Sequence, residues 1–231
     1  MVTIDKRRKY YVMLDTETCP LVKSGAVDPN NMFVYDIGFA VVDKHGNVYE
    51  QRSYVVGDIF FEEKELMKSG YYANKLPLYY DDIRSGSRVV KSFNGIRKEL
   101  ADIMELYNTN IVIAHNARFD DLSLKNTQRW LTKSKYRYFL PYGTVVWDTL
   151  AMAKSILLKR PTYRTFCERN GYMTKGNQPQ TKAEIIYRFI SGNNDFIESH
   201  TGLEDVMIEK DIFHYLMRQH KPMRKELYAR A

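Results

Sequence analysis

The sequence predicts a single α/β domain in which a mixed sheet of five strands is flanked by helices. Strand-like stretches come first, and further strand-like stretches then alternate with helical ones, which is typical of this class. Two stretches, residues 10–14 and 111–114, are uninterrupted apolar runs that suit the buried middle of a sheet. A chain of 231 residues can bury one sizeable core, so we expect one domain over residues 1–231.

The N-terminal elements form a β-meander. The first strand, over residues 10–14, ends at the polar residues 15–18. Two more strands, over 35–42 and 48–56, are separated by a Gly- and Asn-containing stretch suited to a hairpin turn. Residues 58–92 contain a short helical pattern around 62–68 and two tyrosine pairs, but they predict no organisation, and we treat them as an insertion.

The remaining elements alternate between helix and strand. Apolar residues at helical spacing predict a helix over 93–107, and a buried strand follows at 111–114. A helix over 120–131 and a last strand over 144–147 come next. We expect the C-terminal third to be all helix, with breaks at Gly171, Gly176 and Gly192.

Composition narrows the class of protein. A formal net charge of +7 favours a polyanionic partner, although many basic proteins bind no nucleic acid. No apolar stretch is long enough for a membrane span, and the first residues lack the apolar core of a signal peptide. Cys19 and Cys167 are far apart and form no C-x-x-C pair, so no disulfide framework is indicated. We expect a cytoplasmic protein without membrane contact.

Acidic residues follow both buried strands. Asp15 and Glu17 are two positions apart, so the period of a strand places both carboxylates on one face, where they can share a cation. Asp120 follows the second buried strand by a few residues, and the ends of adjacent parallel strands gather the catalytic groups of open α/β sheets. Taken alone, the acidic pair is a common pattern, and Asp120 would more often be a helix cap.

His200 and Asp205 open the last long helix. By themselves they indicate a helix cap with a solvated acid. If all four acids meet, each contacting pair costs on the order of 4 kcal/mol at an effective dielectric of 20, and hard divalent cations would supply the counter-charge. Two Mg²⁺ or Mn²⁺ ions about 4 Å apart can stabilise both reacting oxygens of phosphodiester cleavage. His200, with an ordinary pKa near 6.5, could take the proton from the attacking water.

Three motifs together resemble those of the DEDD superfamily of 3′-to-5′ exonucleases, which includes the proofreading subunit of the bacterial replicative polymerase. They lie in the family's order at residues 14–18, 114–120 and 200–205. A histidine five positions before the last aspartate is similar to the histidine (DEDDh) subgroup, and residues 147–151 resemble a segment often found between its second and third motifs. The resemblance covers about residues 8–219.

The resemblance implies a ribonuclease H-like fold and a 3′-to-5′ exonuclease that releases nucleoside monophosphates from DNA or RNA. It implies that Asp15, Glu17 and Asp205 hold one of two Mg²⁺ or Mn²⁺ ions, with Asp15 bridging to a second ion supported by Asp120, and that His200 is the general base. The expected partner is a single-stranded nucleic acid with a free 3′ end, bound by a monomer or homodimer. The other motif residues expected to contact the substrate are Thr16, Thr18, His115, Asn116 and Phe119.

Two alternatives stay open, a ribonuclease H-like endonuclease and a non-catalytic nucleic-acid-binding module of the same fold. The chain departs from the family at Thr18-Cys19-Pro20, where Thr-Thr-Gly is frequent and contacts the terminal nucleotide, and at Gly202, where Ala is frequent. Residues 129–139 interleave cations with aromatic rings, a composition that suits either single-strand binding or the protein core.

Overall fold

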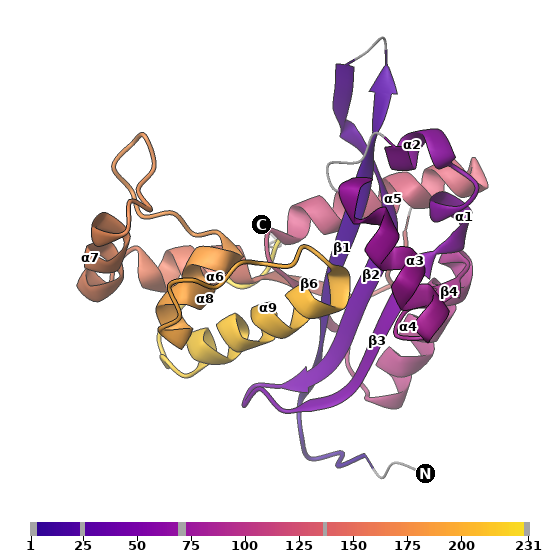
Figure 1. Cartoon of the computed structure of the whole chain (residues 1–231). Coiled ribbons are helices and arrows are strands. Elements are labelled where there is room, and N and C mark those ends of the chain that lie inside the picture. The colour runs from indigo at the N-terminus through magenta and orange to yellow at the C-terminus, as the bar shows by residue number, and fades with distance from the viewer. Residues whose placement is uncertain (1–3, 24–25, 69–72, 136–137, 229–231) are drawn as a thin grey trace.

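A mixed sheet of six strands runs through the middle of the molecule (Figure 1). The computed structural model describes residues 4–23, 26–68, 73–135 and 138–228. The strand order is β4-β3-β2-β1-β5-β6. β1 pairs with β2 and β2 with β3 in antiparallel fashion, whereas the pairs β3–β4, β1–β5 and β5–β6 are parallel. The strands span Tyr10–Lys23, Ala26–Asp43, Val48–Val56, Val89–Lys91, Ile111–Ala114 and Val145–Asp148.

The prediction of five strands is wrong by one. β4 lies within the stretch for which the sequence predicted no organisation, and it has three residues, of which Val89 and Val90 are exposed. A strand this short and this exposed shows neither an apolar run nor a full period of alternation, so its sequence carries no strand signal. Its pairing with β3 is therefore visible only in the folded chain.

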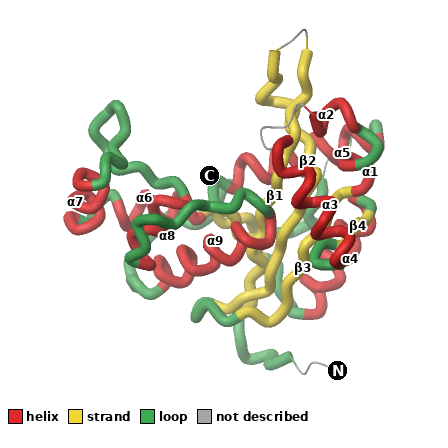
Figure 2. The backbone as a smooth tube through the Cα atoms, in the orientation of Figure 1, coloured by secondary structure: helices red, strands yellow, loops and turns green. Residues whose placement is uncertain are grey.

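The first two strands are longer than the sequence indicated. β1 continues beyond the acidic residues, and β2 starts nine residues earlier than expected, so that the pair extends as a ribbon above the sheet (Figure 2). Thr16, Glu17 and Thr18 are polar, yet they are buried and paired with β2, which the apolar pattern did not indicate. The predicted hairpin after β2 is confirmed, since Gly46 has φ +84° and the Asp43 carboxylate accepts two backbone N–H groups of the turn.

Helices cover the two faces of the sheet and enclose two apolar clusters. Residues of α1, α2, α3, α4 and α5 belong to the first cluster, and residues of α6, α7, α8 and α9 belong to the second. β1 serves both clusters by alternation, because Val12 and Leu14 lie in the first and Tyr11 and Met13 in the second. The helices span Gly57–Phe60, Lys64–Lys68, Leu76–Ser85, Phe93–Leu106, Ala117–Thr132, Thr149–Leu157, Pro161–Arg169, Ala183–Ser191 and Gly202–Met217, with a 3₁₀ turn, η1, at Ala73–Lys75.

The C-terminal third is largely helical, but it is not all helix as expected. Met173 and Pro179 form an isolated bridge, and Trp147 on β6 pairs with Glu226 near the C-terminus. Backbone bonds from Leu227 N to Val146 O and from Asp148 N to Lys225 O cover the outer edge of β6. Among the described residues, no helix is both long and apolar enough to cross a membrane.

Candidate active site

Asp15 and Glu17 project from β1 on the side of α9. They continue the alternation of Tyr11 and Met13, whose side chains lie in the cluster that contains α9. They pair with Gly38 and Asp36 of β2, and a register shift directly after Glu17 ends this alternation. The carboxylates therefore share one face of the sheet, as their spacing indicated.

Asp120 reaches the same region from α5. β5 runs parallel to β1 with Val112 opposite Val12, so the carboxyl end of β5 lies beside the part of β1 that carries Asp15. Asn116, with φ +62°, occupies the N-cap of α5, whereas Asp120, for which a cap role was the alternative, lies in the first turn of the helix. The Thr16 hydroxyl donates a hydrogen bond of 2.7 Å to Asp120 Oδ1, which ties the first and second motifs together.

His200 and Asp205 arrive with the N-terminus of α9, which crosses β2 at very close range. A Cβ atom on Gly202 would lie 2.6 Å from the backbone nitrogen of Gly38, and one on Gly38 would lie 2.2 Å from the carbonyl carbon of Gly202. Glycine at position 202, where the resembled family often has alanine, therefore permits this approach. His200 precedes the crossing with φ +53°, and Asp205 is buried in the first turn of the helix.

Three of the predicted site residues form a set that could hold a metal ion. One ligand atom each from Glu17, His200 and Asp205 lies within 4.8 Å of the other two, although these residues come from opposite ends of the sequence. Carboxylate oxygens are the ligands that Mg²⁺ and Mn²⁺ prefer. The donor set thus fits a hard divalent cation.

Crowding of the acids disfavours their charged forms. Burial, followed by the charge of Asp205, raises the pKa of Glu17 to about 9. Burial also raises the pKa of Asp120 to about 7 and, together with the charge of Glu198, that of Asp205 to about 7. For Asp15, burial and then the charge of Glu209 raise the pKa well above its usual range. Such a cluster is relieved either by protons or by a bound cation.

Two carboxylates of this cluster were missed by sequence reasoning. Glu209 is buried on α9 and its Oε2 accepts a hydrogen bond of 3.1 Å from the backbone N–H of His115. It stands four residues after Asp205 and so lies on the same helix face, a spacing that could have revealed it. Glu198, whose Oε2 is 3.9 Å from His200 Nδ1, lies in an irregular segment and gave no periodic signal.

The imidazole of His200 is about a third exposed, and burial followed by the charge of Lys75 lowers its pKa below the ordinary 6.5. A lowered pKa keeps the ring neutral at pH 7, because the charged form is the one disfavoured. A neutral imidazole at the edge of an acidic cluster can accept a proton from water.

The acids line a cleft of about 1070 Å³ that also contains the five residues expected to contact substrate. Thr16 and Thr18 are buried, whereas Asn116 and Phe119 are exposed. His115 has both ring nitrogens engaged, at 3.0 Å from Thr149 Oγ1 and 3.0 Å from the Thr181 carbonyl oxygen. Its imidazole therefore joins β5, α6 and the segment before α8.

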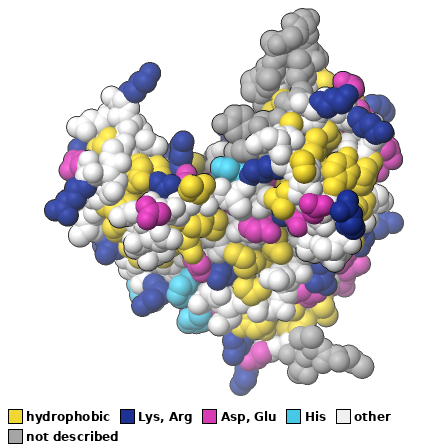
Figure 3. All heavy atoms as spheres, in the orientation of Figure 1, with side chains coloured by type: hydrophobic (Ala, Val, Ile, Leu, Met, Phe, Trp, Pro, Cys, Tyr) yellow, Lys and Arg dark blue, Asp and Glu magenta, His cyan; other side chains and the backbone are white. Residues whose placement is uncertain are grey.

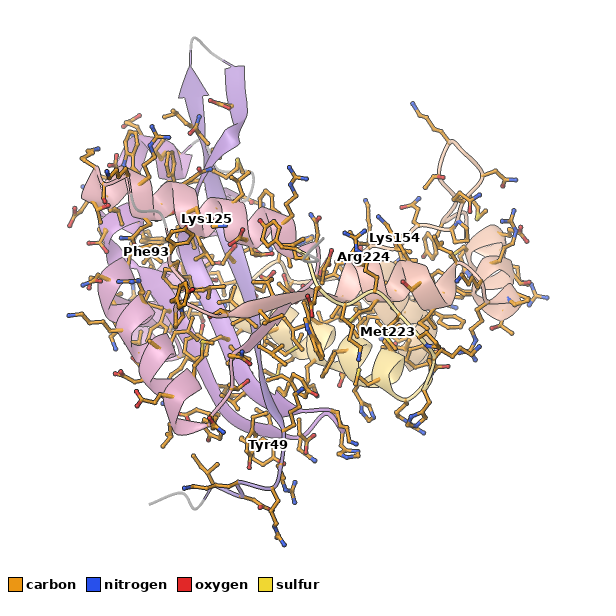
Figure 4. All side chains as sticks on the ribbon, turned by 180° about the vertical axis from the view of Figure 1, so that it is seen from behind. Tyr49, Phe93, Lys125, Lys154, Met223 and Arg224 are labelled. Atoms are coloured by element: carbon orange, nitrogen blue, oxygen red, sulfur yellow. The ribbon has the colours of Figure 1, made fainter. Side chains whose placement is uncertain are left out.

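Lysines also line the cleft, so some of the protein's excess positive charge lies beside the acids. Lys154 projects from α6, and Lys175 and Lys182 come from the segment that joins α7 to α8. Figure 3 shows the molecule hollowed between the lobe of α7 and the central sheet, with histidine and lysine or arginine side chains along the floor. Seen from behind, Lys154 and Arg224 lie near each other, and Arg224 N donates to Ser155 Oγ at 3.2 Å (Figure 4).

Residues 129–139 divide between the core and the surface. Phe139 is buried, and Trp130 packs on Phe33 with its Nε1 donating to Glu63 Oε1 at 2.7 Å. Tyr138 is exposed, and positions 136–137 lie outside the described residues. Only part of this stretch is thus available to a nucleic acid.

Comparisons with known proteins find similar proteins by structure alone. No family model matches the sequence, and no curated protein matches it. The chain is similar in structure to a full-length 3′-exonuclease, with TM-score 0.57 and 15% identity over 96% of this chain and 88% of that one. It is also similar to the nuclease domain of 3′hExo, a DEDDh family member bound to rAMP, with TM-score 0.52 and 13% identity over 96% of this chain and 98% of that one.

A third similar structure is E. coli exonuclease I in complex with a 5cy-dT13 oligonucleotide, with TM-score 0.53 and 13% identity. The match covers 92% of this chain and 41% of that one. At these identities the likeness shows the fold alone, namely an α/β fold with a mixed sheet flanked by helices. The activity has to be argued from the site.

Proposed function

We propose that this protein is a divalent-metal-dependent 3′-to-5′ exonuclease of the DEDDh type with a ribonuclease H-like fold. The observation that carries the proposal is the convergence of Glu17, His200 and Asp205 within 4.8 Å in a cleft that Asp15 and Asp120 also line. The likeness in fold to solved 3′-exonucleases supports it. The finer similarity to a proofreading subunit stays a prediction.

The carboxylates of Asp15, Glu17, Asp120 and Asp205 would hold the cations, which when bound would neutralise the cluster and polarise a phosphate oxygen. The protein's own contribution to the chemistry is proton transfer and placement. His200, kept neutral by its lowered pKa, takes the proton from the water that attacks the terminal phosphodiester. Thr16 holds the Asp120 carboxylate in place through its hydrogen bond.

The substrate fits a cleft that contains both the acids and several lysines. Lys154, Lys175 and Lys182 line the same cleft as the acids, where they can contact phosphates of the strand. Phe119 is exposed in the same cleft and offers a ring on which a base can stack. We infer that a single strand lies in this cleft with its 3′ end at the acids.

The test uses a single-stranded oligonucleotide labelled at its 5′ end and incubated with the protein in Mg²⁺ or Mn²⁺. A ladder that shortens by single nucleotides, with nucleoside monophosphate as the product, supports the proposal. Asp15→Asn and His200→Ala are the site variants, and we expect His200→Ala to lower kcat by about two to four orders of magnitude while binding is kept. Asp211→Asn is the matched control, because Asp211 lies on the same helix as Asp205 but outside the cleft lining.

The same assay separates the alternatives. Internal fragments from a circular single strand would identify an endonuclease, because a circle has no 3′ end. An intact but retarded oligonucleotide at every metal concentration would identify a binding module without catalysis. Wild-type rates in Asp15→Asn would reject the assignment of the acids.

A further inference from the structure

The segment Gly57–Lys91 covers most of the stretch 58–92, whose role the sequence left open, and it brings α3 beside the N-terminus of α9 (Figure 1). It contains α1, α2, η1, α3 and β4. Two basic residues from it reach the chain between Ser199 and Glu204, which carries the proposed general base. This contact connects the unassigned segment to the third motif.

Arg88, just before β4, is the centre of the connection. Its guanidinium is almost fully buried and donates to the carboxylates of Asp36 at 3.0 Å, Asp82 at 2.9 Å and Glu204 at 2.9 Å. It also donates to Ser53 Oγ at 3.0 Å. A planar fork with five N–H donors suits this arrangement, because one group can bind several acceptors in fixed directions. Arg88 thereby joins β2, β3, α3 and α9.

Asp36 connects Arg88 to the backbone at the start of α9. Its Oδ2 accepts three hydrogen bonds, from Tyr79 OH at 2.6 Å, from Arg88 at 3.0 Å and from the backbone N–H of Gly202 at 3.1 Å. The Gly202 N–H is one of the first donors of α9, which have no partner within the helix itself. A carboxylate on β2 therefore anchors the first residue of the helix that carries Asp205.

Lys75, at the end of η1, holds the chain just before the helix. Its Nζ donates to the backbone carbonyl of Ser199 and, at 3.3 Å, to that of His200. These bonds act on the backbone that presents the imidazole, and His200 has a left-handed φ of +53°. The backbone on both sides of Thr201 is thus bound by groups from outside α9.

We propose that Arg88, together with Asp36 and Tyr79, is a positioning unit that sets the start of α9 and so brings Asp205 and His200 to Glu17. The inference rests on the proposed nuclease function and deepens it by assigning a role to the 57–91 segment. The hydrogen bonds of Arg88 go to Asp36, Ser53, Asp82 and Glu204, so it acts through Glu204 and, by way of Asp36, through the backbone at Gly202. A displacement of about 1 Å at a catalytic group can cost on the order of 100-fold in rate.

The test compares Arg88→Met, Arg88→Lys and Tyr79→Phe with a control, Arg52→Met. Arg52 is an ion-paired arginine on β3 whose carboxylate partners are Glu50 and Glu99. Four quantities are measured: kcat, KM for an oligonucleotide, Mn²⁺ affinity of the folded protein by electron paramagnetic resonance, and the thermal midpoint. Tyr79→Phe keeps the buried ring and removes only the hydroxyl donor, so it remains informative if Arg88→Met fails to fold.

We expect Arg88→Met to lower kcat by about 10- to 100-fold and Mn²⁺ affinity by about tenfold, with KM within about twofold of wild type. Arg88→Lys restores part of the loss, because it keeps the charge but not the fork. Tyr79→Phe lowers kcat and Mn²⁺ affinity by a few-fold, and Arg52→Met leaves both unchanged. Folded Arg88 and Tyr79 variants with lower thermal midpoints but wild-type kcat and Mn²⁺ affinity would overturn the proposal. A wild-type protein without nuclease activity would instead overturn the proposed function.

Discussion

Asp205→Asn should make the metal-free protein more stable while it abolishes nuclease activity. Burial and the neighbouring carboxylates raise the pKa of Asp205 from 3.8 to about 7, so the folded protein binds this proton more tightly than the unfolded chain does. A raised pKa contributes stability at low pH, and this contribution is lost as the pH rises through about 7. Asparagine has the same shape and carries no charge, so the variant avoids the loss.

The size of the effect follows from the two pKa values. At about 1.4 kcal/mol for each pH unit, the charge on Asp205 destabilises the folded state by at most about 4 kcal/mol at pH 8 and by less than half of that at pH 5. A proton on a neighbouring carboxylate relieves part of the repulsion on Asp205, so we expect the variant to gain about half of this maximum free energy. A gain of about 2 kcal/mol would raise the melting temperature by roughly 4–8 °C for a chain of this size.

The assay is thermal unfolding followed by circular dichroism in EDTA at pH 5 and pH 8, with Asp211→Asn as the control. In EDTA we expect Asp205→Asn to melt above wild type at pH 8 and closer to it at pH 5. With Mn²⁺ in place of EDTA, we expect the melting temperature of wild type to rise more than that of the variant. A variant that melts at or below wild type at both pH values would refute the view that the acids repel one another in the folded protein.

Two further predictions concern α9. Gly202→Ala should lower the free energy of unfolding by about 1–3 kcal/mol in chemical denaturation, because the added Cβ would lie 2.6 Å from the backbone nitrogen of Gly38. Gly176→Ala is the control, since its nearest neighbour would be 3.9 Å away, and equal losses in the two variants would contradict the packing argument. Glu209→Gln should weaken Mn²⁺ binding measured by calorimetry by several-fold, because it removes a negative charge from the cluster. Unchanged affinity would place Glu209 outside the influence of the metal site, as a partner of the His115 backbone only.

Sequence patterns located most of the sheet because its central strands are defined by local features. The apolar run 111–114 corresponds to β5, and the run 48–56 corresponds to β3 with the same bounds. Sequence patterns did not predict β4, because a three-residue, exposed strand is defined only by its pairing with β3. The extension of β1 was missed for a related reason, since Thr16 and Thr18 interrupt the apolar pattern, yet they are buried and pair with Ile37 and Val34 of β2.

Spacing in the sequence also anticipated which acids would share a face, because a strand alternates with period two whatever its surroundings. Spacing could not predict that Glu17 and Asp205 lie close together, since 188 positions separate them in the sequence. The close crossing of Gly38 by Gly202 brings them together in the folded chain. Periodicity along one element determines where side chains point from that element. Which elements then meet, and which buried arginine holds them there, depends on close packing and paired charges between distant parts of the chain, and these exist only after folding.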